Sequence, residues 1–143
     1  MDTNLELTVP AQFENLTKIS EFISQAAGQA HLDDRADYAI QMAVDEACAN
    51  IIEHAYGGED GSQTIQLISH LRPDGLEIII RDYGFPFDLN QPPQFDPQAP
   101  LEERPAGGMG LFFIYQLVDH VEFKAGTPNG NQLTLFKRRR QPS

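Results

Sequence analysis

The chain has 143 residues, which is typical of one domain and too short for a full-sized barrel or doubly wound enzyme. With 41% hydrophobic and 22% charged residues, its composition is that of a globular protein and excludes a disordered one. Acids outnumber bases by 21 to 10, and four bases form the cluster Lys137–Arg140, so the rest holds 21 acids against 6 bases. Such a body repels nucleic acids and anionic membranes. A phosphate-bearing ligand would need backbone N–H groups and a metal ion to hold it.

No segment of the sequence indicates export or membrane insertion. The single cysteine, Cys48, forms no internal disulfide, and the first residues lack the basic and apolar regions of a secretory signal. The longest nearly apolar run, from Leu111 to Val118, is too short to cross a bilayer. We therefore expect one cytoplasmic domain over residues 1–143, with residues 137–143 as a solvated basic tail.

The first half of the chain predicts a strand and two helices. Leu5–Val9 alternates apolar and polar residues up to Pro10, which predicts an edge strand. Apolar residues at helical spacing predict a first helix over about residues 15–30. A second helix, capped by Asp33 or Asp34, is expected to run to about Tyr56.

The second half predicts two antiparallel strand pairs with a long loop and a helix between them. Residues 63–71 and 76–83 flank the turn signal Pro73-Asp74-Gly75, and residues 121–124 and 132–137 flank Thr127–Gly130. A helix should begin near residues 107–110 and end near Asp119. The fold class expected is an α/β two-layer sandwich of the α+β kind, with a mixed, mostly antiparallel sheet and helices on one face.

The loop before that last helix contains six of the ten prolines, so it forms neither helix nor central strand. A loop of this length in a compact domain is usually functional or disordered. The prolines are Pro86, Pro92, Pro93, Pro97, Pro100 and Pro105.

Polar side chains on the second helix form the first candidate site. Ile40, Val44, Ala47, Ile51 and Ala55 share its apolar side, while Glu46, Asn50 and Glu53 lie nearly opposite, with His54 at the edge of this polar stripe. Glu46 and Asn50 are four residues apart, so both project into one space. They form either a solvated face or a pair in which a carboxylate deprotonates a nucleophile and an amide oxygen ligates Mg²⁺.

Two further segments are compatible with either ligand binding or a purely structural role. After the buried strand Ile78–Ile80, Asp82 either forms a turn or accepts a hydrogen bond from an exocyclic amine, and Gly84 would let the backbone pass close to a flat ring. Gly107, Gly108, Met109 and Gly110 open a helix whose free N–H groups can hold phosphates without a lysine. The alternative for this segment is a glycine-rich joint.

In their order, these motifs resemble the GHKL ATPase superfamily, and within it the bacterial anti-sigma-factor serine/threonine kinases. The helix motif of those kinases, E-A-x-x-N-x-x-x-H-A-Y, stands here from Glu46 to Tyr56. The resemblance covers residues 5–137 and implies the Bergerat-type ATP-binding fold. It also implies a homodimer, and as partners an anti-anti-sigma protein of the STAS type, a sigma factor, or both.

By position, the resemblance implies roles for individual residues. Glu46 would be the general base and Asn50 the Mg²⁺ ligand, with His54 beside the nucleotide. Asp82 would accept from the adenine amino group of ATP next to Gly84. Gly107, Gly108, Met109 and Gly110 would bind the phosphates beneath a lid of about residues 85–106.

The chain departs from the family pattern at two places. Pro86 replaces a frequent glycine, and Gly130-Asn131 stands where Gly-Thr is common. Arg104 does not align cleanly with the lid arginine of some relatives.

Three functions are compatible with these motifs. The first is a protein serine/threonine kinase that phosphorylates an anti-anti-sigma partner and also sequesters a sigma factor. The second is a non-catalytic switch that binds ATP, or nothing, and acts only by binding its partner. The third, a histidine-kinase fragment, is the weakest because no suitable phospho-acceptor sequence follows His31. Retention of Glu46 together with Asn50 and Asp82 favours the kinase.

Overall fold

The computed structural model describes residues 4–85 and 114–139, and its centre is a five-stranded sheet in the order β1-β2-β3-β5-β4. Every pairing in this sheet is antiparallel, so the expectation of a mixed sheet is wrong in that one respect. The strands are β1 (Leu5–Ala11), β2 (Asp60–Arg72), β3 (Gly75–Asp82), β4 (His120–Thr127) and β5 (Gly130–Arg138). Both predicted strand pairs form, with turns at the predicted places.

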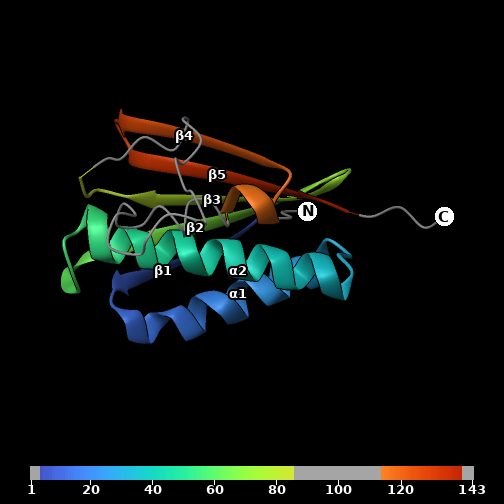
Figure 1. Ribbon diagram of the computed structural model, residues 1–143, viewed down its shortest axis with the longest axis horizontal. Helices are drawn as coiled ribbons and strands as arrows, with labels where there is room; N and C mark the ends of the chain where they lie inside the picture. The colour runs from blue at the N-terminus through green and yellow to red at the C-terminus, as the bar shows by residue number, and fades with distance from the viewer. Residues whose placement is uncertain (1–3, 86–113, 140–143) are drawn as a thin grey trace, which may run out of the picture.

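The helices lie together on one face of the sheet, which confirms the two-layer α/β sandwich (Figure 1). They are the short η1 (Phe13–Asn15), then α1 (Leu16–Gln29), α2 (Asp34–Asn50) and η2 (Ile51–Ala55), which continues α2. A helical turn at residues 114–117 leads into β4. The expected start of this last helix, residues 107–110, and most of the expected lid lie outside the described residues.

Helix α2 forms where its cap and its apolar stripe predict it. Asp33 is the N-cap, and its carboxylate accepts a hydrogen bond of 2.8 Å from the Ala36 N–H, which satisfies one of the free donors of the first turn. The apolar stripe is buried against the sheet and α1 as predicted; it consists of Ile40, Val44, Ala47, Ile51 and Ala55. The helix therefore holds its polar side chains at fixed positions relative to the sheet.

The helix reaches its predicted end with a different winding. From Ile51 to Ala55 it is a π-helix, in which the Tyr56 N–H donates to the Ile51 carbonyl at 2.9 Å. Apolar periodicity does not distinguish this winding from an α-helix over so few residues. Single π-turns of this kind are frequent at functional sites, and this one begins directly after Asn50.

The two-residue period of the strands decides which side chains face the helices. On β3 the buried face runs Leu76, Ile78, Ile80 and then Asp82, so the carboxylate occupies the last position of an apolar row. Asn131 is the register partner of Asp82 on β5 and begins the buried row of that strand. Two polar side chains thus close one end of the core.

The opposite end of the sheet corrects the expectation of a solvated tail for residues 137–139. Lys137 and Arg138 belong to β5, and the Lys137 ammonium donates to the Leu117 carbonyl at 3.0 Å. Arg139 donates through its backbone to Asp74 and through its guanidinium to the Pro73 carbonyl at 2.7 Å. Arg139 thus fastens the β2–β3 turn to the end of β5, while Lys137 bonds to the helical turn that precedes β4.

Among the described residues, no helix has the length and apolar character to cross a membrane.

Candidate functional site

The Asp82 carboxylate lies at the centre of a hydrogen-bonded cluster at the end of β3. Asp82 is 4% exposed, and its Oδ1 accepts from the Gly84 N–H at 2.8 Å and from the Asn131 amide at 3.1 Å. Within the described part of the chain, both donors to this carboxylate go to Oδ1. Oδ2 is therefore the oxygen that remains to accept a hydrogen bond from a ligand.

Burial and hydrogen bonding act on the charge of Asp82 in opposite directions. Removal from water raises the pKa of the Asp82 carboxyl group, while the bonds from Asn131 and Gly84 lower it without cancelling the rise. The pKa is raised on balance. A carboxylate held in this way is a strong acceptor, because few water molecules compete for its free oxygen.

Gly84 allows the chain after β3 to pass directly over the end of η2. A Cβ atom at this position would collide with the backbone of Ala55, so only glycine fits there. The next residue, Phe85, donates its N–H to the Ala55 carbonyl at 2.7 Å. The Tyr56 hydroxyl accepts from the Tyr83 N–H at 2.8 Å and donates to the Thr64 carbonyl at 2.7 Å. These bonds fix the distance between Asp82 and the helix.

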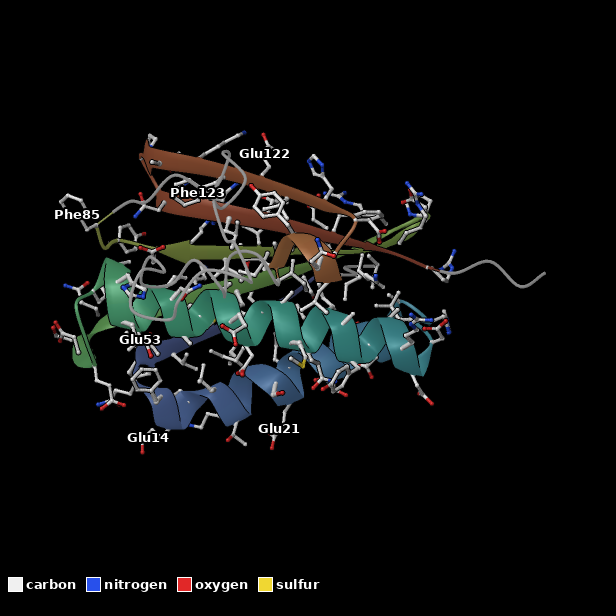
Figure 2. The ribbon with its side chains drawn as sticks, viewed as in Figure 1. Glu14, Glu21, Glu53, Phe85, Glu122 and Phe123 are labelled. Atoms are coloured by element: carbon white, nitrogen blue, oxygen red, sulfur yellow. The ribbon has the colours of Figure 1, made fainter. Side chains whose placement is uncertain are left out.

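Two exposed aromatic side chains flank Gly84. Tyr83 is 62% exposed and Phe85 is 79% exposed. Figure 2 shows Phe85 at the edge of the molecule, beyond the end of β3. Exposed rings beside a glycine and a buried carboxylate are suited to a flat, partly apolar ligand.

The polar stripe of α2 differs from the solvated-face alternative at Asn50. This residue is 5% exposed, and its Nδ2 atom is buried without a hydrogen-bond partner among the described residues. A buried amide in this condition costs free energy unless something binds it. Asn50 is therefore the residue of the stripe whose environment points to a ligand.

Glu46 lies one helical turn before Asn50 and is partly buried. Burial raises the pKa of its carboxyl group, and the nearby charges of Asp45 and Glu53 raise it further. A raised pKa brings a carboxylate closer to the range in which it takes up a proton near neutral pH. The predicted role of Glu46 as the general base stays a prediction.

Glu53 and His54 lie on η2 and are exposed, with the Glu53 carboxylate 3.8 Å from His54 Nε2 (Figure 2). No hydrogen bond found within residues 4–85 and 114–139 ties His54 to Asp82 or Asn50. The predicted role of His54 beside the nucleotide stays a prediction.

The end of η2 lies against the Asp82 cluster, because the Phe85 N–H donates to the Ala55 carbonyl and the Tyr83 N–H donates to the Tyr56 hydroxyl. The pKa of the buried Cys48 thiol is raised by burial first, then by the charges of Asp45 and Asp82. Cys48 is two residues from both Glu46 and Asn50, so it projects from the other side of the helix, into the core. The predicted phosphate-binding residues Gly107, Gly108, Met109 and Gly110 lie outside the described residues. No cluster of metal-binding side chains is found in the described segments.

Sequence analysis noted Asn131 only as a departure from a family pattern and assigned it no role. The structure shows it bonded to both Asp82 and Gly84. The signal that could have identified it is the strand period, because Asn131 precedes Leu133 and Leu135 on the buried face of a strand.

Comparison with known proteins decides the family. The sequence model of the histidine kinase-like ATPase domain matches residues 9–137. The chain belongs to this family. A serine-protein kinase RsbW from Halalkalibacterium halodurans is 36% identical over 141 residues, which cover 94% of this chain and 84% of the relative. RsbW of Bacillus cereus is 33% identical over 124 residues, with 82% and 75% covered.

A solved structure supports the fold of this ATPase-family chain. The crystal structure of the RsbU and RsbW domains of Rv1364c from Mycobacterium tuberculosis aligns with a TM-score of 0.69 at 18% identity. The alignment covers 98% of this chain and 33% of that one, so this chain spans about a third of its length. At this identity the likeness concerns the fold alone. Together, these comparisons confirm the resemblance from which the kinase was predicted.

Proposed function

We propose that this ATPase-family chain is a protein kinase that transfers the γ-phosphate of ATP to a serine or threonine of a partner protein. The observation that carries the proposal is the pairing on α2 of Glu46, whose pKa is raised, with Asn50, whose buried amide is unpartnered. Curated relatives named serine-protein kinases support the same activity.

In this proposal the Asp82 end binds the base of ATP. Asp82 Oδ2 accepts a hydrogen bond from the exocyclic amine of adenine, a donor that guanine lacks at that position. The absence of a Cβ at Gly84 keeps the backbone after Asp82 close to Ala55 of η2. Gly107, Gly108, Met109 and Gly110 are proposed to hold the phosphates through backbone N–H groups.

Asn50 fits a magnesium ion bound to the phosphates. Its amide has no partner that fixes Nδ2, so the side chain can turn its oxygen, the atom type Mg²⁺ prefers, toward a ligand. Mg²⁺ held by one protein oxygen and by substrate phosphates is a common arrangement in phosphoryl transfer. The ion would neutralise phosphate charge that this acidic chain otherwise repels.

Glu46 is proposed as the general base. In phosphoryl transfer the protein mainly positions the reactants and stabilises charge, and a carboxylate accepts the proton of the attacking hydroxyl. The hydroxyl oxygen attacks the γ-phosphorus, ADP leaves, and the hydroxyl proton passes to Glu46. Because Glu46 is one turn from Asn50 on the same helix, base and phosphate-binding amide keep a fixed separation.

The partner is proposed to be an anti-anti-sigma protein of the STAS type, and the chain is also proposed to bind a sigma factor in the cytoplasm as a homodimer. One ATPase domain over residues 1–143, with a lid at about 85–106, would account for these activities. A phosphate dianion added to the partner surface that faces an acidic protein weakens the complex by repulsion. Phosphorylation would then release the partner.

Incubation with Mg-ATP and candidate partners from the same genome, followed by mass spectrometry for phosphoserine and phosphothreonine, tests the proposal. We expect Glu46→Gln to bind ATP and partner normally but to transfer phosphate about a hundred-fold more slowly, because a positioned base is lost. Glu21→Gln is the matched control, since it makes the same change on an exposed residue of α1 and should retain the wild-type rate.

Two results would count against the proposal. Transfer at the wild-type rate by Glu46→Gln would exclude Glu46 as the base. A wild-type protein that binds its partner with Mg-ATP present and never phosphorylates it would be a non-catalytic switch.

A further inference from the structure

Asn131 uses its whole amide group to join the ends of three strands. Its Oδ1 accepts from the Gly126 N–H of β4 at 3.2 Å. Its Nδ2 donates to Asp82 Oδ1 at 3.1 Å and to the carbonyl of Gly84 at 2.9 Å. With 4% of its surface exposed and three bonds in different directions, the side chain has one orientation, and the Nδ2 donors necessarily face Asp82 and Gly84.

The backbone brings Asn131 this close to Asp82 through Gly130. Gly130 has φ +84°, a conformation that favours glycine, and a Cβ atom there would collide with the Asp82 carbonyl oxygen. Strand β5 can therefore begin in direct contact with the last residue of β3. Asp82 and Asn131 are consequently cross-strand partners on the buried face.

This contact determines what the carboxylate can offer a ligand. Asn131 and Gly84 both donate to Oδ1, so the carboxylate cannot rotate without breaking two bonds. A ligand therefore meets Oδ2, which accepts from an amine while the group is ionised and could donate to the guanine carbonyl only if it were protonated. The Asn131 amide also favours the charged form of Asp82, which only accepts.

We propose that Asn131 is the positioning residue that makes the Asp82 carboxylate select adenine over guanine. The inference rests on the proposed binding of the base at Asp82 and deepens it. Asn131 itself makes no contact with the nucleotide; it holds Asp82 as an ionised acceptor with Oδ2 presented to the amine. The effect belongs to base recognition and leaves phosphate transfer unchanged.

Isothermal calorimetry with Mg-ATP and Mg-GTP on the full chain tests this inference in three variants. Asn131→Ala should weaken ATP about ten-fold and leave GTP within about two-fold, which lowers the preference for adenine. Asn131→Thr restores one hydroxyl donor to Asp82 and should recover most of the preference. Asn129→Ala is the matched control, because Asn129 is an exposed asparagine on the adjoining turn and should bind both nucleotides as wild type does.

Asn131→Asp tests the role of Asn131 through the pH dependence of ATP affinity, which would not change if Asn131 were only a structural residue. At low pH the introduced carboxyl group is protonated and donates to Asp82 much as the amide does, whereas at high pH two facing carboxylates repel each other. ATP affinity of this variant should therefore fall as the pH rises from about 5.5 to 8.5, while that of the wild type stays nearly level. The titratable groups on which the charge of Asp82 acts are Cys48 on α2 and Tyr56 after η2, and Tyr83 adjoins Asp82 in the chain. Burial raises the pKa values of Cys48 and Tyr56, which keeps both neutral over this range.

The outcomes separate this inference from the function on which it rests. An unchanged ATP to GTP ratio in Asn131→Ala, with ATP still weakened by Asp82→Asn, overturns the role of Asn131 and leaves the base site in place. If Asn131→Ala does not fold, the test depends on Asn131→Asp. An ATP affinity of that variant that does not vary with pH also overturns the proposed role of Asn131. A wild-type chain that binds no ATP overturns both.

Discussion

The two halves of the candidate site are built in opposite ways. At the end of β3 the protein itself supplies the hydrogen bonds, since Asp82, Gly84 and Asn131 are bonded to one another. On α2, one polar group of the stripe is left unsatisfied, with a buried amide nitrogen at Asn50 that has no partner in the described residues. Glu46 beside it carries a raised pKa, caused by burial and by acidic neighbours.

This difference corresponds to what each half is proposed to bind. A base is recognised by hydrogen bonds of fixed direction, and a rigid acceptor distinguishes an amine from a carbonyl. Phosphates and a metal ion bring strong charges of their own, so their half of the site can be completed by the ligand. The free energy that the unpaired Asn50 Nδ2 costs in the empty protein is recovered if a phosphate oxygen accepts from it.

The largest effect on ATP affinity is expected from a substitution of Asp82, the residue at the centre of the hydrogen-bonded cluster at the end of β3. In Asp82→Asn the amide oxygen can keep both bonds from Gly84 and Asn131, which places the new amide nitrogen where Oδ2 was. A donor then faces the adenine amine, so ATP affinity should fall ten- to a hundred-fold, as expected for about 1.5–3 kcal/mol. GTP, which presents a carbonyl there, should not weaken. Calorimetry with both nucleotides measures the difference.

Asp74→Asn is the control for that measurement, because Asp74 is exposed on the β2–β3 turn at the opposite end of the sheet. It makes the same chemical change and should leave ATP affinity as it is. An Asp82→Asn chain with wild-type ATP affinity would mean that this half of the site does not bind the base.

A smaller effect is expected on the free energy of unfolding of the nucleotide-free protein. A substitution at Asn131 should lower it, and one at Asn50 should raise it. Asn131→Leu removes three hydrogen bonds and leaves buried partners unsatisfied, so it should lower the free energy of unfolding by about 2–3 kcal/mol. Asn50→Leu replaces an unpartnered buried amide with an apolar side chain of similar size and should raise it by about 1 kcal/mol. Urea denaturation measures both changes.

The second variant should also lose the gain in ATP affinity that magnesium gives the wild type. A loss of stability in Asn50→Leu as large as that in Asn131→Leu would show that Asn50 is a structural residue, and the contrast between the halves would disappear.

Sequence reasoning located the elements of the site because local signals decided them. The cap at Asp33, the turn at Pro73-Asp74-Gly75 and the apolar periods each depend on a few neighbouring residues. The role of Asn131 depends instead on the pairing of β3 with β5, strands that are far apart in the chain. The π-winding after Asn50 and the anchoring of Arg139 to Pro73 also depend on tertiary contacts. Features that depend on tertiary contacts cannot be predicted from patterns among neighbouring residues in the sequence.

The smallest expected effect is on the pH dependence of stability. Burial raises the pKa of Asp82 above its value in the unfolded chain, so between these two values the folded state binds more protons. The contribution of Asp82 to stability is therefore full at low pH and is lost as the pH rises through the folded pKa. The contribution of Asp60 to stability depends on pH in the opposite direction. Hydrogen bonds from Ser62 lower the pKa of Asp60, so its contribution is lost as the pH falls.

Urea denaturation of wild type, Asp82→Asn and Asp60→Asn at several pH values from about 3 to 7 isolates these contributions, because the contribution of Asp60 is lost only below its unfolded pKa of 3.8. Relative to wild type, Asp82→Asn should gain stability as the pH rises from acid to neutral. Asp60→Asn should change in the other direction and by less, because its partner Ser62 is exposed and water screens the interaction. A difference between wild type and Asp82→Asn that does not vary with pH would mean that burial of this carboxylate costs nothing. The cluster at the end of β3 would then hold the Asp82 carboxylate at no cost in desolvation. Poor hydration would no longer be a reason for Oδ2 to be a strong acceptor.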